Sequence, residues 1–130
     1  MKHSRVGVWL GFLVMAALTA GGCGDSRRID YSVPTLVKSL KDEDPNMRYW
    51  AAKSLGSFGP HAKSAVPDLV EALKDEHKLV RMGAAYALAE MGASATEALP
   101  LLREAARDPV QEVRDAASYA AERIGAKKKG

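Results

Sequence analysis

The chain has 130 residues, of which 47% are apolar and 27% are charged. This is ordinary globular composition, so it excludes a disordered or fibrous protein, and the length suits one modest domain. The first 22 residues hold two of the 19 basic residues and none of the 16 acidic ones. The rest of the chain therefore has 17 basic and 16 acidic residues, which is nearly balanced. This balance excludes the strongly basic body that is typical of a nucleic-acid binder.

The chain begins with a segment that has the layout of a secretory signal. Lys2 and Arg5 are basic, residues 6–20 are uncharged and mostly apolar, and residues 19–22 are small. Basic, apolar and small-residue regions in this order are typical of a signal peptide. The apolar run is also short for a membrane span, which needs about 20 residues. We therefore predict that residues 1–22 are a signal peptide and that the protein is exported.

Cys23 is the only cysteine, so it has no partner for an internal disulfide. Its position after the sequence LTAGG at 18–22 resembles the lipobox of bacterial lipoproteins, although Ala20 stands where that motif usually has leucine. The resemblance implies that Cys23 is lipidated and becomes the first mature residue. Gly24 follows it, which in that family favours the outer membrane, facing the periplasm. An ordinary cleaved signal peptide or an uncleaved anchor is the alternative.

Residues 23–32 are then predicted to be the lipid-anchored N-terminus and a polar tether. Arg27 and Arg28 lie in this tether and are expected to be solvated, with contact to anionic lipid headgroups as the alternative. At the other end of the chain, residues 127–130 are predicted to be a solvated basic tail.

Between these ends the chain repeats itself every 33 residues without insertions, in units 33–65, 66–98 and 99–126. Six columns are identical in all three units: Pro34, Pro67 and Pro100; Leu36, Leu69 and Leu102; Asp42, Asp75 and Asp108; Arg48, Arg81 and Arg114; Ala51, Ala84 and Ala117; Gly59, Gly92 and Gly125. A fixed period of this size predicts an array of small stacked units.

Each unit is predicted to contain two helices. The first begins beside the repeated proline, which is tolerated in a first helical turn because its missing N–H has no partner there. In unit one, Asp44 is expected to cap the second helix, which runs over about 46–58. The repeated glycine is expected to end that helix in the left-handed conformation. The predicted buried stripe of the second helix is Met47, Ala51, Ser54, Leu55 and Phe58, then Val80, Ala84, Ala87, Leu88 and Met91, then Val113, Ala117, Ala120, Ala121 and Ile124.

These features together resemble HEAT repeats: two short helices per unit, an aspartate six residues before an arginine, and the pattern V-R-x-x-A-A-x-x-L-x-x-x-G. The short period resembles the subgroup first described in phycobilin lyases. The resemblance covers residues 33–125 and implies an all-α solenoid of three repeats. Unit three departs most, at Arg103, Ala106 and Ala121, and a more polar last unit suits the end of a solenoid, which faces water.

The recurring aspartate and arginine are predicted to be structural. The residues concerned are Asp42, Arg48, Asp75, Arg81, Asp108 and Arg114. An active site normally occurs once, whereas these residues recur in every unit. The resemblance implies a ladder in which each arginine contacts backbone carbonyls and an aspartate of its own or the neighbouring unit, as the forked guanidinium group allows.

No other pattern predicts chemistry. His61 and His77 are the histidines beyond the leader, and they lack the spacing of metal ligands. The serines lack a nucleophile motif, and the glycines are placed at helix ends instead of in a phosphate-binding loop. We therefore predict no catalytic residue, no metal and no cofactor.

The second helices are predicted to carry a binding surface on the side opposite the buried stripe, which the HEAT resemblance places on the concave face. Its three columns are Tyr49, Met82 and Asp115; Lys53, Tyr86 and Tyr119; and Gly56, Ala89 and Glu122. Tyrosine and methionine on an open face are typical of recognition surfaces. We therefore expect a protein partner to bind Tyr49, Lys53, Met82, Tyr86 and Tyr119. The rings of Tyr86 and Tyr119 are expected to project about 10 Å apart, a typical helix spacing. The alternative is that some of these side chains merely cover the seams between units. Trp50 lies nearer the buried stripe, and we expect it to be a core residue.

The sequence thus predicts a non-catalytic interaction module or scaffold that binds a protein partner, not a nucleic acid, and is anchored in the bacterial envelope membrane. Two alternatives stay open. One is an enzyme or accessory subunit similar to phycobilin lyases, as the resemblance implies. The other is a structural envelope protein that self-associates by stacking end to end.

Overall fold

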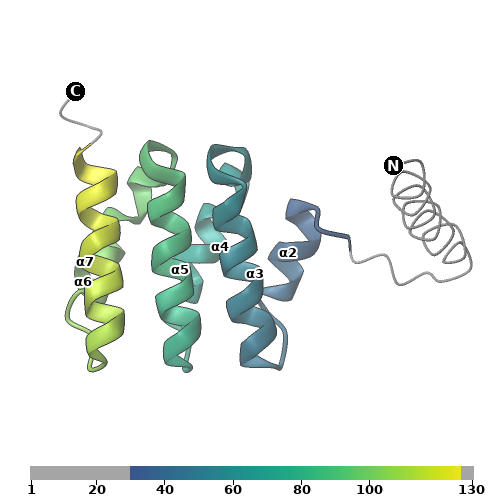
Figure 1. Ribbon diagram of the computed structural model, residues 1–130, viewed down its shortest axis with the longest axis horizontal. Helices are drawn as coiled ribbons and strands as arrows, with labels where there is room; N and C mark the ends of the chain where they lie inside the picture. Colours follow the sequence, from purple (N-terminus) through teal and green to yellow (C-terminus); the bar gives the residue numbers. More distant parts are fainter. Residues whose placement is uncertain (1–29, 127–130) are drawn as a thin grey trace, which may run out of the picture. The chain divides into compact units, whose positions relative to one another are not determined.

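The structure is a computed structural model that describes residues 30–126, so the predicted signal peptide, Cys23, most of the tether and the basic tail lie outside the described residues. Within 30–126 the regular structure consists of α-helices and short 3-10 helices, with no strand (Figure 1). This confirms the predicted all-α solenoid. None of the helices in this range is both long and apolar enough to span a membrane.

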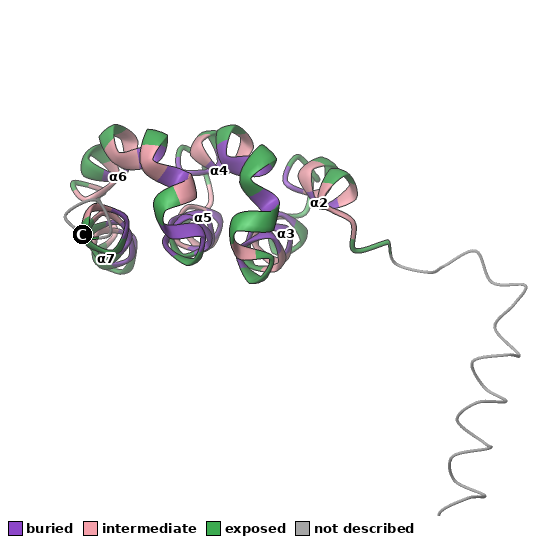
Figure 2. Ribbon diagram, turned by 90° about the horizontal axis from the view of Figure 1, so that it is seen from above, coloured by how far each residue is buried: buried purple, intermediate pink, exposed green. Residues whose placement is uncertain are grey.

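Each unit starts with a short helix, and these are α2 (Val33–Ser39), α4 (Val66–Ala72) and α6 (Leu99–Ala105). Each has its proline in the first turn, as predicted. The longer second helices are α3 (Pro45–Ser57), α5 (Lys78–Met91) and α7 (Gln111–Ala126). Figure 2 shows the two sets as two layers, with α2, α4 and α6 in one row and α3, α5 and α7 in the other.

The helix ends follow from a few polar residues and glycines. The Asp44 side chain accepts a hydrogen bond of 2.9 Å from the Asn46 N–H, which confirms the predicted cap. In unit two the cap is His77, whose Nδ1 accepts from the Leu79 N–H at 3.3 Å. His77 thus has a structural role that the sequence did not reveal.

Two connections form 3-10 helices that were not predicted, η2 (Gly59–Ala65) and η3 (Gly92–Ala98). Gly59 and Gly92 begin them with positive φ of 54° and 57°, the backbone freedom that the prediction required of a glycine. Gly92 has ψ of −127°, however, so it is not in the left-handed helical conformation that was expected. The same prediction is wrong for Gly125. That glycine lies inside α7, which continues to Ala126, and its φ is not positive.

The core lies between the two layers and in the seams between the second helices. Ala51, Ala84 and Ala117 are completely buried at its centre. The prediction of a buried stripe is wrong for two side chains, because Met47 is 41% exposed and Phe58 is 38% exposed. Their equivalents in units two and three are buried: Val80, Met91, Val113 and Ile124. These columns face the preceding unit, and no repeat unit precedes unit one within residues 30–126.

One of the three columns predicted to lie on the open side of the second helices is buried in units one and two. Gly56 and Ala89 are buried, so they belong to the seams and not to the open side. A Cβ atom at Gly56 would lie 2.9 Å from the Cα atom of Ala87 in the neighbouring helix α5. Glycine therefore lets α3 and α5 approach closely at this point. Trp50, which was expected in the core, is only half-buried.

Candidate functional site

The repeated arginines connect successive units. The guanidinium group of Arg48 donates from Nε and Nη2 to the two carboxylate oxygens of Asp75, at 2.8 and 3.0 Å. Its Nη1 donates to the backbone carbonyls of Asp42 and Glu43, at 2.8 and 3.0 Å. One side chain thus holds its own interhelical turn and the aspartate of the next unit.

Arg81 repeats this arrangement one unit further along. It donates to both carboxylate oxygens of Asp108, at 2.8 and 3.1 Å, and to the carbonyls of Asp75 and Glu76, at 2.8 and 3.1 Å. The side chains of Arg81 and Asp108 are 14% and 10% exposed. A two-pronged, largely buried pair of this kind is a strong and directional contact.

The two ends of this ladder differ from its middle. Asp42 accepts a hydrogen bond from the Asp44 N–H, and no arginine reaches its carboxylate within the described residues. Arg114 donates to the carbonyls of Asp108 and Pro109 and to the Gln111 side chain, and residues 30–126 contain no fourth unit whose aspartate it could bind.

The carboxyl groups of Asp75 and Asp108 favour the ionised form. Burial raises the pKa of the Asp75 and Asp108 carboxyls, but hydrogen bonds and attraction from the arginines outweigh it, so both pKa values lie below the usual range. A turn N–H also donates to each carboxylate at 2.9 Å, from His77 to Asp75 and from Val110 to Asp108. Both carboxylates are therefore fixed in place as counter-ions of the arginines that connect successive units.

The second helices present a surface that we name the B-helix face, made of Tyr49, Lys53, Met82, Tyr86 and Tyr119. Tyr86 and Tyr119 are its most open aromatic residues, at 37% and 42% exposure. Their ring centroids are 6.0 Å apart and the rings are tilted by 55°. This is closer than the expected 10 Å, because the rings lean towards each other across the α5–α7 seam. The two side chains therefore form one aromatic pair.

Arg123 extends this pair and was missed from the sequence. Its Nη1 donates to the Tyr119 hydroxyl at 2.9 Å, and its guanidinium carbon lies 5.8 Å from the centre of that ring. Arg123 follows Tyr119 by four residues on the same helix, a spacing that places two side chains side by side. This spacing was the signal that could have revealed it.

Tyr49 and Met82 are less open than expected. Both are half-buried and pack against the core. The Tyr49 ring covers Gly83, where a Cβ atom would lie only 2.7 Å from Tyr49 Cδ2. Met82 lines a small apolar cavity of about 160 Å³ together with Leu79 and Val113. These two side chains cover the seams while presenting one edge outward.

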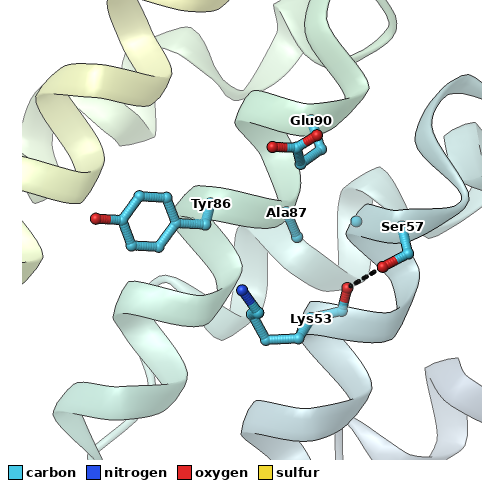
Figure 3. A pocket seen from close by; sticks show the side chains of 6 residues that line it. Lys53, Ser57, Tyr86, Ala87 and Glu90 are labelled. Atoms are coloured by element: carbon cyan, nitrogen blue, oxygen red, sulfur yellow. Dashed lines mark hydrogen bonds between the residues drawn. The ribbon is translucent and has the colours of Figure 1, made fainter.

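A groove of about 340 Å³ lies between α3 and α5 beside Tyr86. It is lined by Lys53, Gly56, Ser57, Tyr86, Ala87 and Glu90. Figure 3 shows the Lys53 and Glu90 side chains on opposite sides of the groove, with the Tyr86 ring beside them. The Ser57 hydroxyl donates to the Lys53 carbonyl at 3.3 Å. The groove therefore offers one positive wall, one negative wall and an aromatic edge.

The buried polar side chains of the described residues are engaged within the fold. The described residues contain no group of three His, Cys, Asp or Glu side chains placed to hold a metal ion. Every buried polar side-chain atom in this part of the chain has a hydrogen-bond partner. The open surfaces include the aromatic pair, the groove and the end of the array at α3, and a cavity of about 500 Å³ lies beside Arg81 and Asp108.

Comparison with known proteins identifies the fold. A family model described as HEAT repeats matches residues 14–63 and residues 33–122. Among solved structures the chain is similar to an engineered protein crystallised by the Northeast Structural Genomics Consortium, with 28% sequence identity and a TM-score of 0.61. That match covers 72% of this chain and 45% of the engineered one, so this chain spans less than half of the engineered protein. No curated protein matches the sequence. The chain belongs to the HEAT-repeat family.

Proposed function

We propose that the protein is a non-catalytic scaffold, held at the envelope membrane by lipidated Cys23, whose B-helix face binds a protein partner. The HEAT-repeat fold is typical of protein-interaction scaffolds. The observation that carries the proposal is the pair of exposed rings, Tyr86 and Tyr119, on the open side of the second helices.

The surroundings of this pair have the composition of an interface. Tyrosine gives a large contact area and loses few rotatable bonds when it is fixed. The charged side chains of Lys53, Glu90 and Arg123 surround the rings and are all exposed. An aromatic centre within a polar rim is the usual arrangement of a protein-binding patch.

A further copy stacked onto the end of the array is a weaker candidate. It would join Arg114 of one copy to Asp42 of the next and so continue the ladder. However, Ser118 and Glu122 are exposed in columns where units one and two have buried alanine or glycine. Stacking would bury the Glu122 carboxylate in a seam without a partner, which is costly.

The proposal is tested by photo-crosslinking in intact membranes. A photoreactive amino acid is placed at position 86 or 119, and at position 71 as a control, where exposed Glu71 lies on α4 in the other layer. A discrete adduct from positions 86 and 119, but not from 71, is the expected result. The same adducts from all three positions would contradict a site on the B-helix face.

The captured partner then allows a quantitative prediction. The double substitution Tyr86→Ser with Tyr119→Ser is expected to weaken binding by more than tenfold, because interface aromatics commonly contribute about 2 kcal/mol each. Phe58→Ser is the matched control, since Phe58 is 38% exposed and lies at the end of α3. Binding is measured in detergent, where the membrane plays no part.

The double variant should keep its helical circular dichroism spectrum, because both rings are largely outside the core. If it unfolds, the tyrosines are core residues. If it folds and binds as before, the partner uses another surface.

A further inference from the structure

The exposed large apolar side chains of the described residues fall into two groups. Tyr86 and Tyr119 lie on the B-helix face, whereas Tyr31, Met47 and Phe58 are 51%, 41% and 38% exposed near the start of the array. We name this second surface, made of Tyr31, Met47, Trp50 and Phe58, the N-terminal end face. It is not used by the proposed partner site.

This end face consists of seam residues that no repeat unit precedes within residues 30–126. The columns of Met47 and Phe58 are filled in unit two by Val80 and Met91, which are 0% and 2% exposed. Tyr31 covers part of the surface, since its ring lies 5.4 Å from the Trp50 ring at an angle of 59°. The result is an apolar and aromatic surface at one end of the solenoid.

The opposite end has different chemistry. Its seam columns carry Ser118 and Glu122, both exposed, where units one and two have buried alanine or glycine. Ala121 there replaces the buried leucines at 55 and 88. A polar last seam is expected of an end that faces water. The apolar end face lacks such a cap, so its large side chains suit contact with an apolar surface.

We propose that the N-terminal end face rests on the lipid bilayer that holds Cys23. This inference depends on the proposed lipid anchor. Seven residues lie between Cys23 and Tyr31, so the eight steps of even a fully extended tether keep the bilayer within about 28 Å of this face. A short tether gives the lipid surface a high effective concentration that a second copy of the chain lacks.

The residue types also fit a membrane surface. Tyrosine and tryptophan are enriched at the level of lipid headgroups, where one edge of the ring is apolar and the other is wet. Met47 and Phe58 supply the apolar side chains that would enter between the headgroups. Glu43 and Asp44, just before Met47, are exposed, so attraction to anionic lipids does not carry the contact.

This orientation has a consequence for partner binding. With the end face on the bilayer, the second and third units extend away from it by about 10 Å each, the usual helix spacing. Tyr86 and Tyr119 then stand above the headgroups and face sideways. The B-helix face stays accessible to a partner that is soluble or anchored beside it.

The fluorescence of Trp50 provides the test. The chain has two tryptophans, and removal of residues 1–22 removes the other one, Trp9, so that emission comes from Trp50 alone. The protein is expressed from the full-length sequence and isolated from membranes, and its intact mass shows whether residues 1–22 are removed and whether Cys23 carries acyl chains. It is then reconstituted into phosphatidylcholine vesicles with or without bromine on the acyl chains. We expect Trp50 emission to be blue-shifted and to lose most of its intensity in the brominated vesicles.

Three variants control this result. Met47→Glu with Phe58→Glu should remove most of the quenching, and Phe58→Ser should reduce it without adding charge. Tyr86→Ser with Tyr119→Ser replaces two equally exposed aromatics on the other surface and should leave the quenching unchanged. Circular dichroism confirms that each variant is folded.

The outcomes separate the orientation from the anchor. A mass without acyl chains at Cys23 removes both the anchor and this inference. Acylated protein whose Trp50 emission is unquenched overturns the inference alone. If Trp50 emission is blue-shifted but unquenched and the protein forms a crosslinked dimer, the end face contacts a second copy of the chain. That result also overturns the inference of bilayer contact.

Discussion

Arg81→Ala is expected to lower the free energy of unfolding by about 3 kcal/mol, because it removes a largely buried ion pair and leaves a carboxylate behind. Arg81 makes four hydrogen bonds, two to the Asp108 carboxylate and two to the carbonyls of its own turn. Without it, the hydrogen bond from the Val110 N–H is what the Asp108 carboxylate retains within residues 30–126. For a domain of this size, such a loss lowers the melting temperature by about 15 °C.

Arg114→Ala is the matched comparison, with an expected loss of about 1 kcal/mol. Arg114 bonds to turn carbonyls and to Gln111 but holds no aspartate of a following unit. Both variants remove the same side chain from the same column, so their difference isolates the contact between units. Thermal melts followed by circular dichroism measure it, and equal small shifts would show that the ladder does not stabilise the array.

The pH dependence gives an independent measurement of the same contact. The Asp75 and Asp108 carboxyls have lowered pKa values in the folded state. The stability that they contribute is therefore complete above the unfolded pKa of about 4 and is lost as the pH falls through the lower folded values. Because Arg81→Ala removes the partner that lowers the pKa of Asp108, that variant should lose less stability on acidification than the wild-type protein.

The fold could be predicted in detail because its signals are local and several of them recur. A proline stands in the first turn of all three first helices, and a glycine with positive φ follows the second helix in two units, whereas Asp44 caps the second helix of unit one alone. Such signals do not depend on what surrounds the helix. Repetition at one period then fixes how the helix pairs stack.

Errors arose where neighbouring units decide the outcome. Met47 and Phe58 match the buried pattern of the second helix, yet they are exposed because unit one has no repeat before it in residues 30–126. Gly56 lies on the side predicted to be open, yet the approach of α5 buries it. Helical periodicity gives the side of a helix but not the distance to its neighbours.

The predicted binding surface shows the same limit. The sequence placed Tyr86 and Tyr119 in one column, but their separation depends on side-chain rotamers, which bring the centroids to 6.0 Å. Tyr49 belongs to an adjacent column on the same side of the second helices, yet it leans onto Gly83 because glycine leaves room for its ring. Whether an outward side chain stays open depends on the size of the residue facing it across the seam.

Gly56→Leu is expected to destabilise the fold by at least about 3 kcal/mol, and Gly56→Ala by about 1–2 kcal/mol, because overpacking a tight seam costs more than helix propensity returns. A Cβ atom at this position meets Ala87 at 2.9 Å from its Cα and 3.2 Å from its Cβ. Backbone atoms cannot rotate away, so α3 and α5 would have to separate along the whole seam. Denaturant unfolding monitored by circular dichroism measures both variants.

Gly125→Ala is the control that separates packing from propensity. Gly125 lies inside α7, and a Cβ atom there would have no neighbour within 4 Å. Alanine in a helix is favoured over glycine by about 0.5–1 kcal/mol, so this variant should be slightly more stable than the wild-type protein. Opposite signs for the two alanine variants are the expected result. If Gly56→Ala stabilises the protein as Gly125→Ala does, α3 and α5 are not in close contact. The exposed Glu122, which occupies the same column as Gly56 in unit three, would then no longer argue against stacking of further copies.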